Sequence, residues 1–120
     1  MRIKKLKVCH VRLPLRRPWK TSYGVETHVE SILIKAFSDN GFSAWVETCP
    51  MTRPTYMPEC AASTFRVITK VMAPLVLGRD LNSPRDVHKL LTGFRGNPFA
   101  KAGLDAACWA LHAQELAEPL

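Results

Sequence analysis

The sequence lacks any apolar run near the roughly 20 residues that a membrane-spanning helix needs. Its N-terminus, MRIKKLKVCHVRLPL, places charges among the apolar positions that a signal peptide would keep uninterrupted. These absences exclude an integral membrane helix and a secretory leader in the sequence as given. We therefore expect a cytoplasmic protein that makes no membrane contact.

The common catalytic and metal-binding signatures are also missing. There is no G-x-G-x-x-G, P-loop, G-x-S-x-G or H-E-x-x-H, and the four cysteines form no C-x-x-C pair. The histidines and acidic residues are scattered, so their spacing predicts no metal site. Lys5 and Lys7 form a Lys-x-Lys, but they open a basic strand and are not expected to act as acid or base.

Acidic residues are scarce: 10 Asp and Glu stand against 17 Lys and Arg, which gives a net charge of +7. Such an excess is typical of proteins that bind nucleic acid or acidic surfaces. The basic residues are densest before residue 21, where they alternate with apolar residues as on the solvent face of a strand. The alternation favours a solvated face, and the binding interpretation stays open.

The 120 residues, 47% of them hydrophobic, suit one globular domain. Near-alternating or continuous apolar patterns predict three strands, over residues 3–15, 28–37 and 42–47. Ser38-Asp39-Asn40-Gly41 contains the Asn-Gly pair of a type I′ turn, so the second and third strands should be antiparallel neighbours.

Three helices should follow these strands. The first is expected to begin at Pro58 and to close at Pro74 and Gly78, with Glu59 at its positive N-terminal end. Ser83-Pro84-Arg85-Asp86 predicts a second helix as far as Gly93, and Asn97-Pro98 predicts a third that reaches about Leu116. The fold class is therefore α+β, with a three-stranded antiparallel sheet followed by three helices.

Two irregular segments interrupt these elements, and both carry large side chains. RRPWKTSYG (16–24) should form a loop after Pro18 ends the first strand, and TCPMTRPTYMPE (48–59) has three prolines that stop a regular ladder. Side chains of this kind either close over a ligand or pin a loop to its own sheet. The candidate ligand-contacting residues are Trp19, Tyr23, Met51 and Tyr56.

Two acidic residues are further candidates. Glu47 ends the third strand, where it either orients loop amides or a neighbouring basic residue or is an edge-strand charge. Asp105 stands four residues after Lys101 on the third helix, which predicts a weak ion pair.

Four stretches together resemble a known family. PLRRPWKTSYG, NGFSAWVE, MTRPTYMPE and RGNPFAKAGLDAACWALHA resemble the N-terminal capping domain of the mandelate racemase and muconate lactonizing subgroup of the enolase superfamily. Thr21 to Gly24, Met51 and Gly96 to Leu104 look most like its o-succinylbenzoate synthase and N-acylamino acid racemase branch. The resemblance extends over residues 1–120.

The resemblance implies that this domain covers the mouth of a (β/α)-barrel, which removes a proton α to a carboxylate with the help of Mg²⁺. It matches Trp19 and Met51 to substrate-contacting lid residues, and Tyr23 and Tyr56 to weaker candidates. The barrel that carries the lysines and the metal ligands is absent, so we expect a fragment or a truncated product that is inactive alone. The family's Gly-Trp-Gly-Glu-like run reads Ala44-Trp45-Val46-Glu47 here, and its Trp-Asp reads Trp109-Ala110.

Two functional hypotheses follow. The first is the lid of a Mg²⁺-dependent synthase or racemase that encloses a small carboxylate substrate. The second is a stand-alone basic module that binds nucleic acid or an acidic protein, and it explains only the charge.

Overall fold

The computed structural model describes residues 1–120 and shows three strands followed by helices. In chain order the elements are β1 (Ile3–Thr21), β2 (Gly24–Ser38), β3 (Ser43–Thr48), α1 (Ala61–Val67), the π-helical turn η1 (Ile68–Met72), α2 (Ala73–Val76), α3 (Arg85–Leu91) and α4 (Pro98–Leu116). The α+β class is confirmed. None of the helices has the length and apolarity needed to cross a bilayer.

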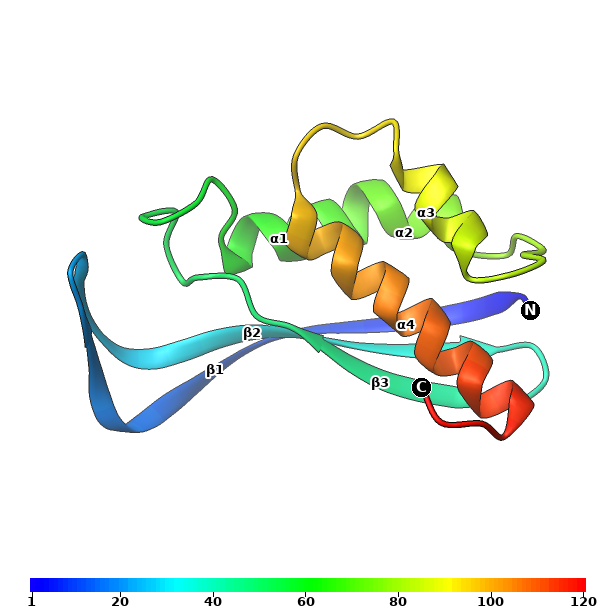
Figure 1. The fold of residues 1–120 in the computed structure, drawn as a ribbon, viewed down its shortest axis with the longest axis horizontal. Helices are drawn as coiled ribbons and strands as arrows, with labels where there is room; N and C mark the ends of the chain where they lie inside the picture. Colours follow the sequence, from blue (N-terminus) through cyan, green and yellow to red (C-terminus); the bar gives the residue numbers. More distant parts are fainter.

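The sheet is antiparallel in the order β1-β2-β3, and the helices cover one of its faces (Figure 1). Side chains of a strand point alternately to opposite faces, which puts Ile32, Ile34 and Ala36 of β2 on the helix side. All three are fully buried. The continuous apolar run of β2 is therefore explained by its central position.

Small residues let α4 approach this sheet closely. Ala100, Gly103 and Ala107 recur at helical spacing and are buried together with Leu104 and Leu111. This face of α4 packs against β3 and β2. The alanine-rich composition of the last predicted helix thus corresponds to the most extensive helix-to-sheet contact in the fold.

The turn between β2 and β3 differs from the predicted type I′ turn. Four residues, 39–42, separate the strands, and Gly41 alone among them has a positive φ, of 87°. The Ser38 N–H donates to the Phe42 carbonyl (3.0 Å), and the Phe42 N–H donates to the Ser38 hydroxyl (3.2 Å). The serine before Asn-Gly thus closes a longer loop, while the predicted antiparallel pairing is confirmed.

The first helical segment also departs from its predicted limits. It begins at Ala61, after an N-terminal cap in which Cys60 and Ser63 exchange hydrogen bonds, and not at Pro58. It then continues through Pro74 to Val76. Proline disrupts a regular α-helix by its missing N–H and its ring, and the π-helical turn that ends at Met72, two residues before Pro74, changes the hydrogen-bond ladder there.

Candidate functional site

The β1–β2 hairpin projects beyond the helices at one end of the molecule (Figure 1). Contrary to prediction, β1 does not end at Pro18 but continues to Thr21, and Trp19 pairs with Glu26 of β2. Between the pairs Pro14–His28 and Trp19–Glu26, β1 has four residues opposite a single residue of β2. Leu15 to Pro18 therefore form a four-residue bulge, a position in which a strand tolerates a proline.

The predicted second irregular segment is a loop, as expected, and it faces the base of this projecting hairpin. It runs from Cys49 to Cys60, between β3 and α1, and contains three prolines. The Ala61 N–H, the first of α1, donates to the carbonyl of Met51 (2.9 Å). The backbone of Met51 is therefore fixed to the start of a helix.

A hollow of about 300 Å³ lies between the hairpin and this loop. Trp19 and Met51 both line it, one from each segment. The remaining lining residues are Leu15, Glu26, His28, Val29, Glu30, Cys49, Pro50 and Thr52. The hollow is open, and Trp19 is 54% exposed, so its indole is available for contact.

The other two candidate residues do not line the hollow but lie against each other. The rings of Tyr23 and Tyr56 are stacked, with centroids 5.9 Å apart and 30° between the planes. Close by in sequence, the Arg53 guanidinium lies 3.8 Å from the Glu26 carboxylate. These two contacts join the hairpin to the loop. One partner in each is largely exposed, Tyr56 in the first and Arg53 in the second, so each contact is worth about 1 kcal/mol or less.

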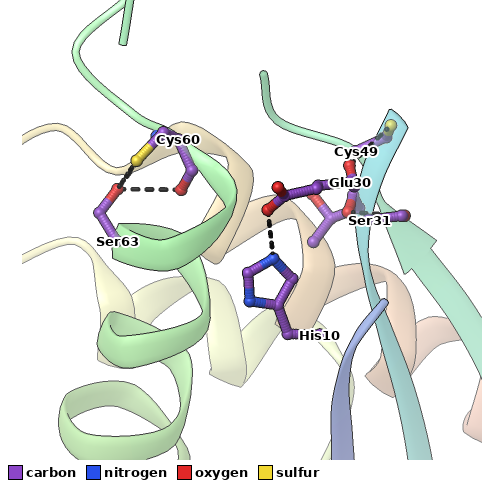
Figure 2. Close-up of polar contacts among 7 residues, drawn as sticks. His10, Glu30, Ser31, Cys49, Cys60 and Ser63 are labelled. Atoms are coloured by element: carbon purple, nitrogen blue, oxygen red, sulfur yellow. Dashed lines mark hydrogen bonds and ion pairs between the residues drawn. The ribbon is translucent and has the colours of Figure 1, made fainter. Parts of the chain in front are cut away.

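The side of the hollow that β2 forms carries polar side chains. Glu26, His28 and Glu30 continue the face of β2 that is apolar under the helices. His10 Nε2 lies 2.6 Å from Glu30 Oε2, and the two side chains point toward each other between the sheet and α1 (Figure 2). The His10 ring also lies beside Phe65 of α1, with centroids 6.0 Å apart. This contact joins the sheet to the first helix where the apolar core ends.

Two cysteines beside the loop have opposite pKa shifts. Partial burial, followed by the charge of Glu47, raises the pKa of the exposed Cys49, whose thiol donates to the Glu30 carbonyl (3.5 Å). Hydrogen bonds from the backbone and the hydroxyl of Ser63 lower the pKa of Cys60 at the helix cap (Figure 2). Both thiols belong to the loop ends and have no catalytic partner arranged as a triad.

The two acidic candidates do not join the hollow. Glu47 accepts a hydrogen bond from the Ser31 hydroxyl (2.5 Å) on the open face of the sheet and forms no ion pair. The predicted ion pair of Lys101 with Asp105 is wrong. The Lys101 ammonium donates instead to the carbonyl of Phe94, in the loop that precedes α4. Interaction across the loop before α4 is thus preferred to the i,i+4 pair.

Sequence reasoning missed the role of Glu59. It was assigned to the first helix, whereas its carboxylate accepts from the Phe99 and Ala100 N–H groups at the start of α4 (2.8 and 3.0 Å). Glu59 is only 4% exposed. An acidic residue just before α1 is expected to cap that helix. Glu59 instead caps α4, which begins about 40 residues later, and a local sequence pattern cannot predict this contact.

The structure groups no three His, Cys, Asp or Glu side chains that could hold a metal ion. The residues of this domain therefore do not fit the Mg²⁺ implied by the family resemblance, and we assign them no role in a metal-dependent step. The chemistry that the site offers is enclosure: an aromatic ring, a thioether and aliphatic groups face one space beside two carboxylates.

The fold and the paired segments define a capping domain, and comparison with known proteins gives the family. Residues 3–120 match the family described as "Mandelate racemase / muconate lactonizing enzyme, N-terminal domain", and the chain belongs to this family. Among relatives, it is 37% identical over 120 residues to the N-succinylamino acid racemase of Thermus thermophilus, covering 100% of this chain and 32% of that protein. It is 31% identical over 111 residues to the o-succinylbenzoate synthase of Geobacillus stearothermophilus, covering 92% and 30%.

Solved structures agree. An enolase-superfamily protein from Listeria innocua superposes with a TM-score of 0.91 at 28% identity, covering 97% of this chain and 31% of that one. The N-succinyl Arg/Lys racemase of Bacillus cereus gives 0.87 at 29%, with 97% and 31% covered. The chain thus spans about a third of the length of the proteins it matches. These comparisons do not support the stand-alone basic module.

Proposed function

We propose that residues 1–120 form the lid of a larger enolase-superfamily enzyme, which encloses a small carboxylate substrate and selects its side chain. The observation that carries the proposal is the shared hollow of Trp19 and Met51, because two segments far apart in sequence bring apolar groups to one space. In this proposal the remainder of the protein is a (β/α)-barrel that supplies the lysines and the Mg²⁺ ligands. The cytoplasmic location predicted from the N-terminal sequence stays a prediction.

The lid acts by binding and by excluding water. Apolar groups that cover the substrate remove solvent from the position where a proton α to the carboxylate is abstracted, which strengthens the electrostatic interactions there. Contacts made equally in the ground state and the transition state change KM more than kcat. Tyr23 and Tyr56 are assigned a supporting role, in which their stacked rings hold the two segments together.

Substrate class follows from the relatives within this proposal. The named activities of the relatives, o-succinylbenzoate synthase and N-succinylamino acid racemase, make a succinylated carboxylate the first substrate to test. The isolated 120-residue chain is expected to show no turnover of either kind. Mg²⁺-dependent turnover by the purified chain would refute the assignment of all chemistry to the barrel.

The decisive experiment replaces Trp19 by alanine in the full-length protein. We expect KM to rise and the order of preference among N-succinylamino acids to change, while kcat for the best substrate changes less. Trp45→Ala is the matched control, because Trp45 is similarly exposed (51%, against 54% for Trp19) but projects from β3 on the open face of the sheet. Equal effects of the two substitutions, or an unchanged preference in Trp19→Ala, would contradict the lid role.

A further inference from the structure

Both ends of the loop that carries Met51 are hydrogen-bonded to the same residue. At the first end, the Thr48 hydroxyl donates to the carbonyl of Phe99 (3.0 Å). At the other end, the N–H of Phe99 donates to Glu59 Oε2 (2.8 Å). The ten residues 49–58 are thus closed by one residue of α4, and we call this arrangement of Thr48, Glu59 and the Phe99 backbone the clip.

The clip is buried, so its hydrogen bonds are not exchanged readily for water. Glu59 is 4% exposed and Thr48 is 6% exposed. A buried carboxylate without hydrogen bonds is costly, and Glu59 forms no ion pair to offset this cost. Instead it accepts from Phe99 and Ala100 at the positive end of the 19-residue helix α4, and from the Thr64 hydroxyl (3.2 Å). The carboxylate is therefore held in one orientation by three donors.

From Glu59 the connection to Met51 is short. Cys60 follows directly, and its N–H donates to the Ser63 hydroxyl (3.0 Å) in the cap of α1. The next residue, Ala61, donates its N–H to the Met51 carbonyl (2.9 Å). A displacement of Glu59 from α4 would move this peptide and, with it, the backbone of Met51.

We propose that Glu59 is a positioning residue of the lid, which holds Met51 in the wall of the hollow by clipping the loop to the first turn of α4. The proposal rests on the proposed function in one respect: that function is what gives the position of Met51 a consequence for substrate binding. The clip itself does not depend on any substrate. The proposal explains why a carboxylate is buried at position 59, where an apolar side chain could fill the same space in the core.

The test uses the 120-residue chain with Glu59→Gln. A carboxamide has one acceptor oxygen for the two N–H groups of Phe99 and Ala100, and it places an NH₂ donor against the other. We expect amide hydrogen exchange of Ala61 to accelerate about tenfold or more, and the ¹³C-methyl signal of Met51 to broaden or to lose order. The methyl group of Met72, which is fully buried in the core, should keep its order.

Two further variants keep the proposal falsifiable. Thr48→Val removes the other half of the clip at nearly constant volume and should loosen Met51 in the same way, even if Glu59→Gln fails to fold. Ile68→Val lowers stability within the buried core without touching the clip, and it should leave the Met51 methyl unchanged. An unaltered Met51 methyl and Ala61 amide in both clip variants would overturn the proposal.

Turnover separates this inference from the proposed function. In the full-length protein, Glu59→Gln should change KM and substrate preference in the direction of Trp19→Ala, with a smaller change in kcat. A looser Met51 with unchanged preference would support the clip and contradict the lid role. An altered preference in Trp19→Ala, with the Met51 methyl and the Ala61 amide unaltered in both Glu59→Gln and Thr48→Val, would support the lid role and overturn the clip.

Discussion

A single added methyl group at Gly103 should destabilise the domain although alanine is the better helix former. Gly103 lies in the buried face of α4 at its contact with the sheet. A Cβ built there would stand 2.9 Å from Thr48 Cγ2, 3.0 Å from Ile34 Cδ1 and 3.2 Å from Thr48 Cβ. Carbon atoms in contact are normally about 3.5 to 4.0 Å apart, so α4 or both side chains must shift by roughly 0.5 Å or more.

Two opposing terms set the size of the effect. Overpacking of a buried contact costs about 1 to 3 kcal/mol, and replacing glycine by alanine inside a helix returns about 1 kcal/mol. The free energy of unfolding should therefore fall by roughly 1 kcal/mol, and by up to about 2 kcal/mol if Thr48 also loses its hydrogen bond to Phe99. For a domain of this size, 1 kcal/mol lowers Tm by about 4 °C.

Urea and thermal denaturation of Gly103→Ala, Thr48→Ser and the double variant measure this effect. Thr48→Ser deletes the methyl group nearest to the new Cβ and keeps the hydroxyl. The double variant should consequently be more stable than the sum of the two single changes predicts, by about 0.5 to 1 kcal/mol. A Gly103→Ala chain that is more stable than the parent, as helix propensity alone requires, would refute the close seating of α4 on β3.

Other predictions concern the thiols and the loop contact. At neutral pH iodoacetamide should modify Cys60 before Cys108. Hydrogen bonds with Ser63 lower the pKa of Cys60, whereas burial and then the charge of Asp105 raise the pKa of Cys108 to about 12. Mass spectrometry gives the order of labelling, and labelling of Cys108 first would contradict the prediction. The contribution of Cys108 to the free energy of unfolding should be complete below pH 9 and should fall between pH 9 and 12, because the thiol ionises at lower pH in the unfolded chain than in the folded one. The fall is up to about 1.4 kcal/mol per pH unit. Denaturation of Cys108→Ala as a function of pH should lack this decline. Tyr56→Ala should change the free energy of unfolding by less than about 1 kcal/mol yet accelerate amide hydrogen exchange of Thr55, whose N–H donates to the Arg53 carbonyl (2.8 Å) within the loop; unchanged exchange would show that the ring stack does not restrain the loop.

Local pattern predicted the order of elements because their signals are short-range. The continuous apolar run around Ile34, the antiparallel pairing indicated by the Asn-Gly pair and the Asn97-Pro98 start each depend on neighbours in the sequence, and the strands and the last helix confirm them. The hairpin end was mispredicted for a different reason. A proline normally stops a strand, and only the pairing of Trp19 with Glu26 beyond a four-residue bulge shows that β1 resumes.

The candidate site was predictable only in its composition. Large side chains on two irregular segments identified Trp19 and Met51, which line one hollow, and Tyr23 and Tyr56, which stack on each other. Their substrate contacts stay a prediction. The polar residues Glu26 and Glu30 had no signal apart from their place in β2, because the sheet face becomes polar only where the helices no longer cover it. The role of Glu59 depends on α4, 40 residues away, and required the fold itself.

The attachment of the loop to Phe99 predicts an uneven tolerance to substitution. Position 99 contributes its N–H and its carbonyl, groups that every residue except proline carries, so its side chain is free to vary as far as the loop is concerned. Positions 48 and 59 contribute side-chain oxygens, which few residues can replace at the same reach. A library of variants should therefore accept many residues at 99 and reject proline there, while it accepts few at 48 and 59, so the residue at the centre of the arrangement is the one whose identity matters least.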